Sequence, residues 1–515
     1  MEINPQIRLR PPAKSALTDA VASARTCYSP EIITSAEVTG EQLHRIGKQC
    51  FDSGHHTVFL HKMFTFDITA SRHAFHMLHY QPFYNTSQSS QRYVVLKKPE
   101  VIIPPDITGD ARSLFCSIAK EMWGIYEDLI EKLTPIVKEN YPGKRKLDSR
   151  AAEKLAIETA RYVLPIGAKS TAIHSVQLMT LLRLYKLAGG GGWGWELKSL
   201  TEQAMNIVKK QEPDFDQYIP LPIPEESNPE QNFVPNNGLG LLAKNEARRN
   251  VLRERLKQKT SLLIDWSHHS SDSLNLASSL TSGEAITDYR QALDPMTNSH
   301  LVDSLHTDWQ APYSRILSQS WVSFLKRISH SANAQDQRHR TINSVTSLPQ
   351  LAETATPDYI TPTLINYDYE LSKVYDRAMQ RLYETKLELL KAYEVPVLSA
   401  MYLTPNSHAL YVQQSGSLLA FRHKWILRSC WRAQREIWGI TMEELGQING
   451  RWPELKPYLG PPCYVRYLPD VSQNSLERQG SKGRNWIRPK CTEGRLYCDI
   501  PVIWKRFTTD MERLI

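Results

Sequence analysis

Apolar residues recur at helical spacing in one long stretch of each half of the chain, from Leu114 to Ile136 and from Leu371 to Leu390. This spacing predicts one long amphipathic helix in each half. A short apolar run that ends in a proline precedes each helix, Val101 to Pro104 in the first half and Tyr359 to Pro362 in the second, and we expect both runs to be extended. The two halves therefore predict the same order of elements.

A segment rich in proline and asparagine separates these halves. Its two parts, residues 219–229 and 235–238, show no helical periodicity. Residues that restrict the backbone geometry or interrupt regular helices and strands are typical of linkers. We predict four parts: a first domain at residues 1–218, a linker at 219–239, a second domain at 240–452 and an irregular C-terminal extension at 453–515.

The similar order of elements indicates an internal duplication, which constant offsets in residue number support. The landmark pairs that lie 258 positions apart are Ser71 and Ser329, Asn85 and Asn343, and Pro104 and Pro362. The pairs that lie 240 positions apart are Pro165 and Pro405, and Glu196 and Glu436. The smaller offset is expected if an intervening connection is shorter in the second copy. Chance agreement of common residues is the alternative explanation.

Composition narrows the class of protein further. The 515 residues are 41% hydrophobic, which excludes wholesale disorder. Basic residues exceed acidic ones by 62 − 54, or +8, and this surplus suits an anionic small molecule at least as well as a nucleic acid. No stretch approaches the roughly 18 apolar residues of a membrane span, and the first residues are polar rather than a signal segment. We therefore expect a soluble, cytoplasmic protein with no membrane partner.

The seven cysteines are too few for a disulfide scaffold in a chain of this length. Those that stand singly, and that we expect to be reduced and packed, are Cys27, Cys50, Cys116 and Cys430. Cys463, Cys491 and Cys498 lie closer together, but their uneven spacing falls short of the paired pattern typical of zinc sites. We predict no metal site, and metal binding by these three cysteines is the alternative.

One segment of the first half, from Ser90 to Tyr93, carries the most informative motif. Its order Ser-Gln-Arg-Tyr, together with the segments from Ala24 to Ser29 and from Gly54 to Phe66, resembles the flavin-dependent thymidylate synthases. The hallmark of that family is an Arg-His-Arg triplet, two further residues, a serine, four more residues and then Ser-x-Arg. Here the triplet position holds Tyr80-Gln81-Pro82, so this half alone lacks the cations that the family uses to hold its flavin.

The second half supplies the missing triplet. An offset of 258 leads from the altered triplet to Arg338-His339-Arg340, with Gln335 upstream where the family has a glutamine. The same offset leads from the Ser-x-Arg element to Leu348 and Gln350, so the second half lacks that element. The two halves therefore resemble the family in complementary places.

A second complementary pair lies near the end of each copy. Arg161, in the order Ala-Arg-x-x-Leu-Pro, resembles the family arginine that meets the nucleotide phosphate, whereas the second copy has Met401 there. Arg428, followed by Ala-Gln-x-Glu-Ile from Ala433, resembles the family's Leu-Arg helix. The first copy has no clear counterpart of Arg428, because its nearest arginine, Arg183, is out of register.

The resemblance implies one composite site. In the family, a homotetramer builds each nucleotide site from elements of two subunits, and the fused halves would supply both sets from one chain. The implied catalytic residues are Ser90 and Arg428, and the implied cofactor-binding residues are Gln335, Arg338, His339 and Arg340. The implied substrate-binding residues are Ser90, Arg92, Arg161, Gln335, Arg338 and Arg428. Arginines suit this task because the paired donors of a guanidinium match phosphate oxygens.

The resemblance also implies a fold and a reaction. The fold is α+β, with two tandem copies of a small mixed β-sheet flanked by long helices and an irregular C-terminal tail. The reaction is C5 methylation of deoxyuridine monophosphate (dUMP), or a related one-carbon transfer, with reduced FAD, NADPH and 5,10-methylenetetrahydrofolate. Nucleic acid is not required. A homodimer is expected, because two fused chains rebuild a tetramer of single domains.

Two other functions stay open on the sequence alone. The fusion could act with its flavin on a modified pyrimidine nucleotide or on a uridine in RNA. It could also bind a nucleotide or flavin without catalysis. At the level of single residues, an Arg-His-Arg triplet is more often a solvated turn, and a polar run around Ser90 is more often a plain loop.

Overall fold

Each half of the chain forms a four-stranded antiparallel sheet. The computed structural model describes residues 4–9, 15–31, 33–80, 83–143, 146–189, 193–228, 238–294, 298–303, 306–466, 491, 493, 497–500 and 507–515. The first sheet has the order β1 (Gln6–Leu9), β2 (Met63–Ser71), β4 (Lys169–Gln177) and β3 (Tyr84–Gln88). The second has the order β5 (Ser261–Trp266), β6 (Trp321–Ser329), β8 (Ala409–Ser417) and β7 (Asn343–Thr346).

The paired elements confirm the duplication and the α+β class, but the strands of both described sheets pair antiparallel throughout, so the sheets are not mixed. Strand β6 begins and ends 258 positions after β2, and β8 begins and ends 240 positions after β4. The same offset of 258 relates helices α3 (Arg72–Leu78) and α10 (His330–Asp336). The offset of 240 relates α6 (Leu178–Ala188) to α14 (Leu418–Arg428), and α7 (Trp195–Gln211) to α15 (Arg435–Arg451). The change of offset falls between β7 and β8, as the shorter connection requires.

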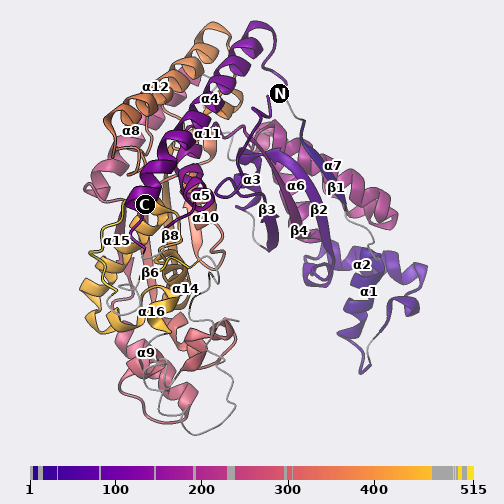
Figure 1. Cartoon of the computed structure of the whole chain (residues 1–515). Helices are drawn as coiled ribbons and strands as arrows, with labels where there is room; N and C mark the ends of the chain where they lie inside the picture. Colours follow the sequence, from indigo (N-terminus) through magenta and orange to yellow (C-terminus); the bar gives the residue numbers. More distant parts are fainter. Residues whose placement is uncertain are drawn as a thin grey trace.

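Buried side chains alternate with more exposed ones along the strands, and the buried ones form a hydrophobic core on one face of each sheet. In β2, Phe64, Phe66 and Ile68 are buried while the intervening Thr65 and Asp67 are half-buried, as expected for side chains that point to opposite faces. Helices α6 and α7 pack on the buried face of the first sheet, and α14 and α15 pack on that of the second. Figure 1 shows the two sheets in separate parts of the molecule.

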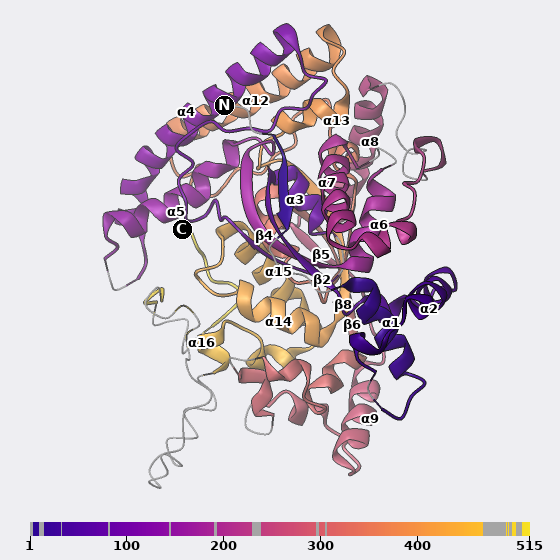
Figure 2. The ribbon, with the colours of Figure 1, turned by 90° about the vertical axis from the view of Figure 1, so that its right-hand side faces the viewer.

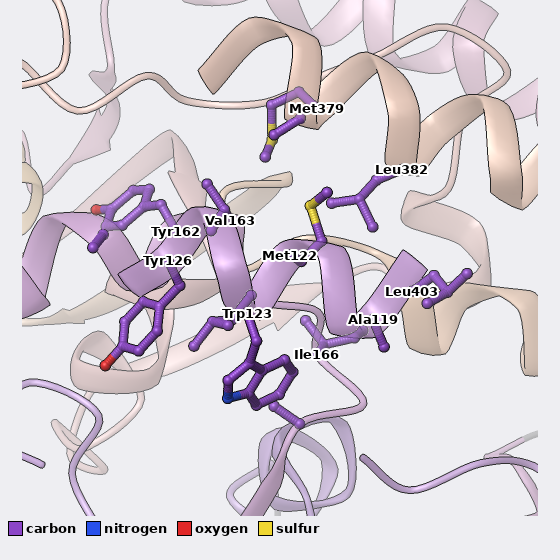
Figure 3. Close-up of a cluster of buried hydrophobic side chains, with 14 of the residues drawn as sticks. Ala119, Met122, Trp123, Tyr126, Tyr162, Val163, Ile166, Met379, Leu382 and Leu403 are labelled. Carbon is purple, nitrogen blue, oxygen red and sulfur yellow. The ribbon is translucent and has the colours of Figure 1, made fainter. Parts of the chain in front are cut away.

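The long helices of the two copies share a third core. Helices α4 (Gly109–Asn140) and α5 (Ser149–Ala160) of the first copy pack with α12 (Tyr369–Ala392) of the second, and Figures 1 and 2 both show α4 beside α12. In Figure 3, Met122 of α4 lies near Met379 and Leu382 of α12. The predicted helices lie within α4 and α12, so this prediction is confirmed. Because the core draws on both copies, the copies do not pack as independent bodies.

The run from Val101 to Pro104 and its counterpart from Tyr359 to Pro362 do not continue a sheet. Each makes a single β-bridge, Val101 to Ala168 and Tyr359 to His408. Proline has no N–H group to donate, which is consistent with pairing that stops after one residue.

Two equivalent clusters join the copies at their centre. Glu196 accepts hydrogen bonds from the backbone N–H of Ser71 (2.7 Å) and from the hydroxyl of Tyr402 in the other copy (2.7 Å). Its counterpart Glu436 accepts from the backbone N–H of Ser329 (2.7 Å) and from the hydroxyl of Tyr162. Burial raises the pKa of both carboxyl groups above the usual value. The two serines that mark the repeat in the sequence therefore mark a contact between copies.

The backbone confirms that the copies face each other. Pro165 pairs with Pro405 in an antiparallel bridge. On either side of it, the N–H of Ile166 donates to the carbonyl of Thr404, and the N–H of Asn406 donates to the carbonyl of Leu164, both at 2.8 Å. Equivalent segments of the two copies thus meet directly at the interface.

The remaining helices lie outside these paired elements. They are α1 (Ala16–Thr26), α2 (Gly40–Asp52), α8 (Gly238–Leu256), α9 (Ser270–Ser282), α11 (Pro349–Ala352), α13 (Val397–Ala400) and α16 (Pro462–Val465). No helix in the described part of the chain is long and apolar enough to cross a membrane.

The predicted linker and tail fall partly outside the described residues. Helix α8 begins at Gly238, inside the linker predicted at residues 219–239, of which residues 229–237 are not among those described. Within the predicted extension, Phe507 packs against the core of the second copy, and Leu514 and Ile515 pack against the shared core. The division into domains stays a prediction.

Candidate functional site

Arg92 of the first copy reaches the second copy. One terminal nitrogen of its guanidinium donates to the side-chain oxygen of Gln335 (3.4 Å), and the other donates to the carbonyl of Arg432 (2.8 Å). Its Nε donates to the buried carboxylate of Glu158. Two residues that the sequence assigns to opposite sides of one site, Arg92 and Gln335, are therefore in contact.

Gln434 joins the second predicted arginine to the same group. The Arg161 guanidinium donates to the Gln434 side-chain oxygen (2.8 Å), and the Gln335 amide donates to the same oxygen. The Gln434 amide donates in turn to the hydroxyl of Tyr162. Because this glutamine connects Arg161 to Gln335, it belongs to the candidate site. The sequence places Gln434 in a recognised segment, two residues before Glu436, but does not indicate this role.

The Arg338-His339-Arg340 triplet lies against strand β3 of the first copy. Arg338 donates to the carbonyl of Thr86 and to the side-chain oxygen of Gln88, both at 3.2 Å. The guanidinium of Arg340 lies over the ring of Tyr84, 5.1 Å from its centre. The triplet of one copy is thus positioned by the strand that leads to the Ser-x-Arg element of the other.

The buried His339 is paired with the half-buried Arg428. Arg428 donates to Nε2 of His339 (2.9 Å) and to the backbone carbonyl of Gln335 (3.1 Å). Burial, followed by the charge of Arg428, holds the pKa of His339 well below its usual value. The imidazole is therefore neutral near pH 7, and its Nε2 accepts the hydrogen bond that Arg428 donates. In this arrangement His339 orients Arg428, while Arg338 and Arg340 supply the charge of the triplet.

Ser90 occupies a turn at the edge of this group. Its hydroxyl accepts the backbone N–H of Arg92 (3.2 Å), and its carbonyl accepts the N–H of Tyr93 and Val94. The side chain is half-buried. The turn fixes the start of the segment that carries Arg92, and the hydroxyl still has a proton to donate.

Positive charge exceeds negative charge around these residues. Burial and the nearby guanidinium groups of Arg161 and Arg338 lower the pKa of Arg72 to about 9. Burial also lowers the pKa of Arg428, to about 10. Even so, both side chains stay charged near pH 7. Arginines held close together at some electrostatic cost suit an anionic ligand, which relieves their repulsion.

Arg72 is a candidate site residue that is not among the site residues predicted from the sequence. Within the described part of the chain, its guanidinium has no ion-pair partner. It lines a small enclosed space together with His76, Gln88, Gln337 and Asn406. Its counterpart in the second copy is His330. The Ser-Arg order that begins α3 could have indicated it, because the second copy has Ser-His at the same place.

A cavity of about 600 Å³ adjoins the triplet. His339, Arg340 and Asn343 line it from the second copy, and Tyr80 and Phe83 line it from the first. The two aromatic side chains are 37% and 65% exposed. Volume, cations and exposed rings together fit a flat aromatic cofactor that carries phosphate. Gln81 and Pro82, the rest of the altered triplet, lie outside the described residues.

The cysteines at the C-terminal end stay single thiols. Cys463 and Cys491 are half-buried and Cys498 is buried. Among the residues that the structure describes, no group of three or more histidines, cysteines, aspartates or glutamates is arranged to hold a metal ion.

Buried histidines beside the site predict a loss of stability in acid. Burial lowers the pKa of His73 to about 3 and that of His76 and His174 to about 4, from an ordinary value of 6.5. Below pH 6.5 the unfolded chain binds protons that the folded chain does not. Each such histidine therefore removes about 1.4 kcal/mol of stability per pH unit as the pH falls from 6.5 toward its folded pKa.

His174→Gln tests this prediction, because Gln414 already stands at the equivalent position of the second sheet. Urea unfolding at about pH 6 to about pH 4.5 should show a shallower loss of unfolding free energy for the variant, by about 1.4 kcal/mol per pH unit. The exposed His55 provides the control, and His55→Gln should keep the slope of the parent. Equal slopes for the parent and the His174 variant would mean that His174 is protonated in the folded state.

Comparison with known proteins matches both copies. The model of the thymidylate synthase complementing protein family matches residues 12–214 and 262–454. A flavin-dependent thymidylate synthase of Clostridium tetani is 29% identical over 202 residues, which cover 38% of this chain and 79% of that protein. One from Mycobacterium sp. (strain KMS) is 32% identical over 160 residues, which cover 29% of this chain and 59% of that protein.

Among solved structures, the UMP/dUMP methylase PolB of Streptomyces cacaoi bound with 5-Br dUMP is similar at 16% identity, with a TM-score of 0.34. The match covers 42% of this chain and 95% of that one. The two regions of the family model leave out only the ends and the predicted linker with its surroundings. Together with the repeated sheets and helices, they show that the chain belongs to the thymidylate synthase complementing protein family, as a diverged member with two tandem copies.

Proposed function

We propose that this protein catalyses flavin-dependent C5 methylation of dUMP at one site built from both copies. The observation that carries the proposal is the contact of Arg92 and Arg161 of the first copy with Gln335 and Gln434 of the second. Residues that the resemblance divides between two subunits are here neighbours within one chain. The names of the related enzymes and of the structural neighbour agree with a uracil nucleotide as substrate.

The residues of the first copy suit the nucleotide phosphate. Arg92 and Arg161 present guanidinium groups from the Ser-x-Arg turn and from the end of α5, and Arg72 adds a third. A nucleotide monophosphate carries about two negative charges near neutral pH, which paired donors of this kind bind strongly. Ser90 can add a hydroxyl donor, and Arg428 can reach the nucleotide from the other copy.

The residues of the second copy suit FAD. Arg338 and Arg340 would hold its phosphates or ring oxygens, and the Gln335 amide can pair with a base or a flavin edge. Tyr80 and Phe83 would pack against its flat ring. When bound, FAD reduced by NADPH supplies the redox chemistry that no side chain can, and 5,10-methylenetetrahydrofolate supplies the carbon. The protein binds and orients these groups and excludes water.

The equivalent position on the other side of the interface does not suit the same ligands. Leu348, which replaces Ser90, packs against the apolar core of the first copy. Ala188 stands at the position of Arg428 and is fully buried. The side-chain amide of Asn245 in α8 donates to the backbone of Gln350, which replaces Arg92. We therefore expect one working site per chain, and a homodimer would carry two.

Purified protein tests the proposal directly. We expect it to bind one FAD and one dUMP per chain, to lose its yellow colour with NADPH, and to form thymidylate only when both dUMP and 5,10-methylenetetrahydrofolate are present. Flavin absorbance, titration calorimetry and product chromatography measure these results. Flavin and dUMP binding without product would instead favour a non-catalytic binding protein. Turnover of a modified pyrimidine or of RNA uridine, but not of dUMP, would assign a different substrate.

A further inference from the structure

Four charged side chains lie wholly inside the second copy. Lys326 of β6, Asp336 of α10, Lys424 of α14 and Glu444 of α15 have no exposed side-chain surface, and we call them the buried charge network. Asp336 lies 2.8 Å from Lys326 and 3.3 Å from Lys424. Glu444 lies 3.3 Å from Lys326 and 3.1 Å from Lys424. Each cation thus contacts both anions.

Neutral partners complete the network. The Gln414 side-chain oxygen accepts from both Lys326 and Lys424. The indole N–H of Trp425 donates to Glu444 at 2.8 Å. Burial alone would raise the pKa values of Asp336 and Glu444. The positive charges of Lys326 and Lys424 outweigh this effect and hold both pKa values below their usual range. Asp336 and Glu444 are therefore ionised near pH 7, and two carboxylates face two lysine side chains.

The first copy has the same fold without these charges. The offsets of the duplication place Ile68, Leu78, Leu184 and Ala204 at the four positions, and all four are buried in its core. Taking ions out of water is costly, and well-packed apolar residues are often at least as stabilising as a buried ion pair. Since the same fold accommodates apolar residues at these four positions, stability alone does not account for the network.

The network adjoins the residues of the candidate site that only the second copy carries. Asp336 ends helix α10, directly after Gln335 and two residues before Arg338. Lys424 lies one turn before Arg428 on α14. Arg428 in turn donates to the carbonyl of Gln335 and to His339. Two successive links therefore join α14 to the end of α10: Lys424 to Asp336, and Arg428 to Gln335 and His339.

We propose that the buried charge network positions Arg428 and the segment from Gln335 to Arg340 for binding the nucleotide and the flavin. Ion pairs and hydrogen bonds specify the distance and direction between α10 and α14, whereas apolar side chains tolerate small shifts between packed helices. The four residues touch no ligand themselves and act through Arg428 and the triplet. This role rests on the proposed function.

The first test replaces the buried charge network with the apolar residues that stand at the equivalent positions of the first copy. The variant carries Lys326→Ile, Asp336→Leu, Lys424→Leu and Glu444→Ala together. We expect the variant to stay folded, while its Kd for FAD rises about fivefold or more. As a control, Lys62→Met with Glu212→Gln removes a buried ion pair of the first copy (3.0 Å) and should leave the Kd for FAD unchanged. A folded apolar variant with the parent's Kd would overturn the proposal.

A double-mutant cycle keeps the proposal testable if the apolar variant does not fold. Asp336→Asn keeps the size of the side chain and is measured with and without Arg428→Ala, below the unfolding transition of every variant. If Asp336 acts through Arg428, its replacement should weaken FAD or dUMP binding severalfold in the parent and much less when Arg428 is absent. Equal effects in both backgrounds would contradict the proposal. Failure of the parent itself to bind FAD would instead refute the proposed function.

Discussion

Replacing Arg92 by alanine should raise the Kd for dUMP by about one to two decades, and replacing Arg428 should do the same. Each variant loses a charge-assisted contact worth about 1.5–3 kcal/mol. The two residues belong to different copies, yet both contact Gln335. Arg92 donates to the side-chain oxygen of Gln335, and Arg428 donates to its backbone carbonyl. Isothermal titration of dUMP into the FAD-loaded protein measures both effects.

The other copy supplies matched controls for this experiment. Gln350 stands in place of Arg92, and the exposed Arg183 is the nearest arginine to the position equivalent to Arg428. Gln350→Ala and Arg183→Ala should leave the Kd for dUMP nearly unchanged in folded protein. Small, equal effects in all four variants would mean that the copies share no nucleotide site. A large effect at Arg92 alone would place the nucleotide wholly in the first copy.

The duplication could be predicted from the sequence because its landmarks are backbone requirements. Ser71 and Ser329 each cap the helix that follows by accepting an N–H, and each binds a buried glutamate. Pro165 and Pro405 meet at the centre of the interface. Residues that fix backbone geometry keep their spacing within each part of the repeat, so an offset of 258 finds the serines and an offset of 240 finds the prolines.

The contacts between the copies could not be predicted in the same way. A constant offset relates only equivalent residues of the two copies. The contacts between the copies join residues that are not equivalent: Arg161 contacts Gln434, and Arg338 contacts Thr86 and Gln88. Such pairs depend on how the copies face each other across the shared core. The sequence likewise does not indicate that His339 accepts a hydrogen bond from Arg428, because an Arg-His-Arg order is compatible with several side-chain directions.

The geometry also explains how complementary losses are tolerated. Two facing copies create two equivalent sites at their interface, and each site is built from residues of both copies. Under the proposed function, changes in the first-copy triplet and in the second-copy Ser-x-Arg element affect the same site, so the other site keeps all of its predicted residues. The site that was lost is then free to become apolar, as the packing of the half-buried Leu348 and the buried Ala188 in the core of the first copy illustrates. Losses at random would have damaged both sites.

Replacing Arg338 or Arg340 by alanine should reduce bound FAD, with Kd values about one to two decades above that of the parent. Arg340 lines the cavity beside Tyr80 and Phe83, and Arg338 lies two residues before it. Under the proposed function, each loss would leave phosphates or ring oxygens of the cofactor without a charged partner. Arg338 also donates hydrogen bonds to Thr86 and Gln88, so its loss can disturb β3, whereas the guanidinium of Arg340 lies over the ring of Tyr84.

Lysine replacements separate charge from geometry in this experiment. Arg340→Lys keeps the charge and should recover most of the affinity if a single charge suffices, whereas Arg338→Lys should recover little because its fork-shaped contacts to Thr86 and Gln88 need two nitrogens. Flavin fluorescence during titration with FAD measures all four Kd values, and thermal unfolding confirms that each variant is folded. Parent-like FAD binding in both alanine variants would remove the triplet from the cofactor site and leave the cavity beside it without an assigned ligand.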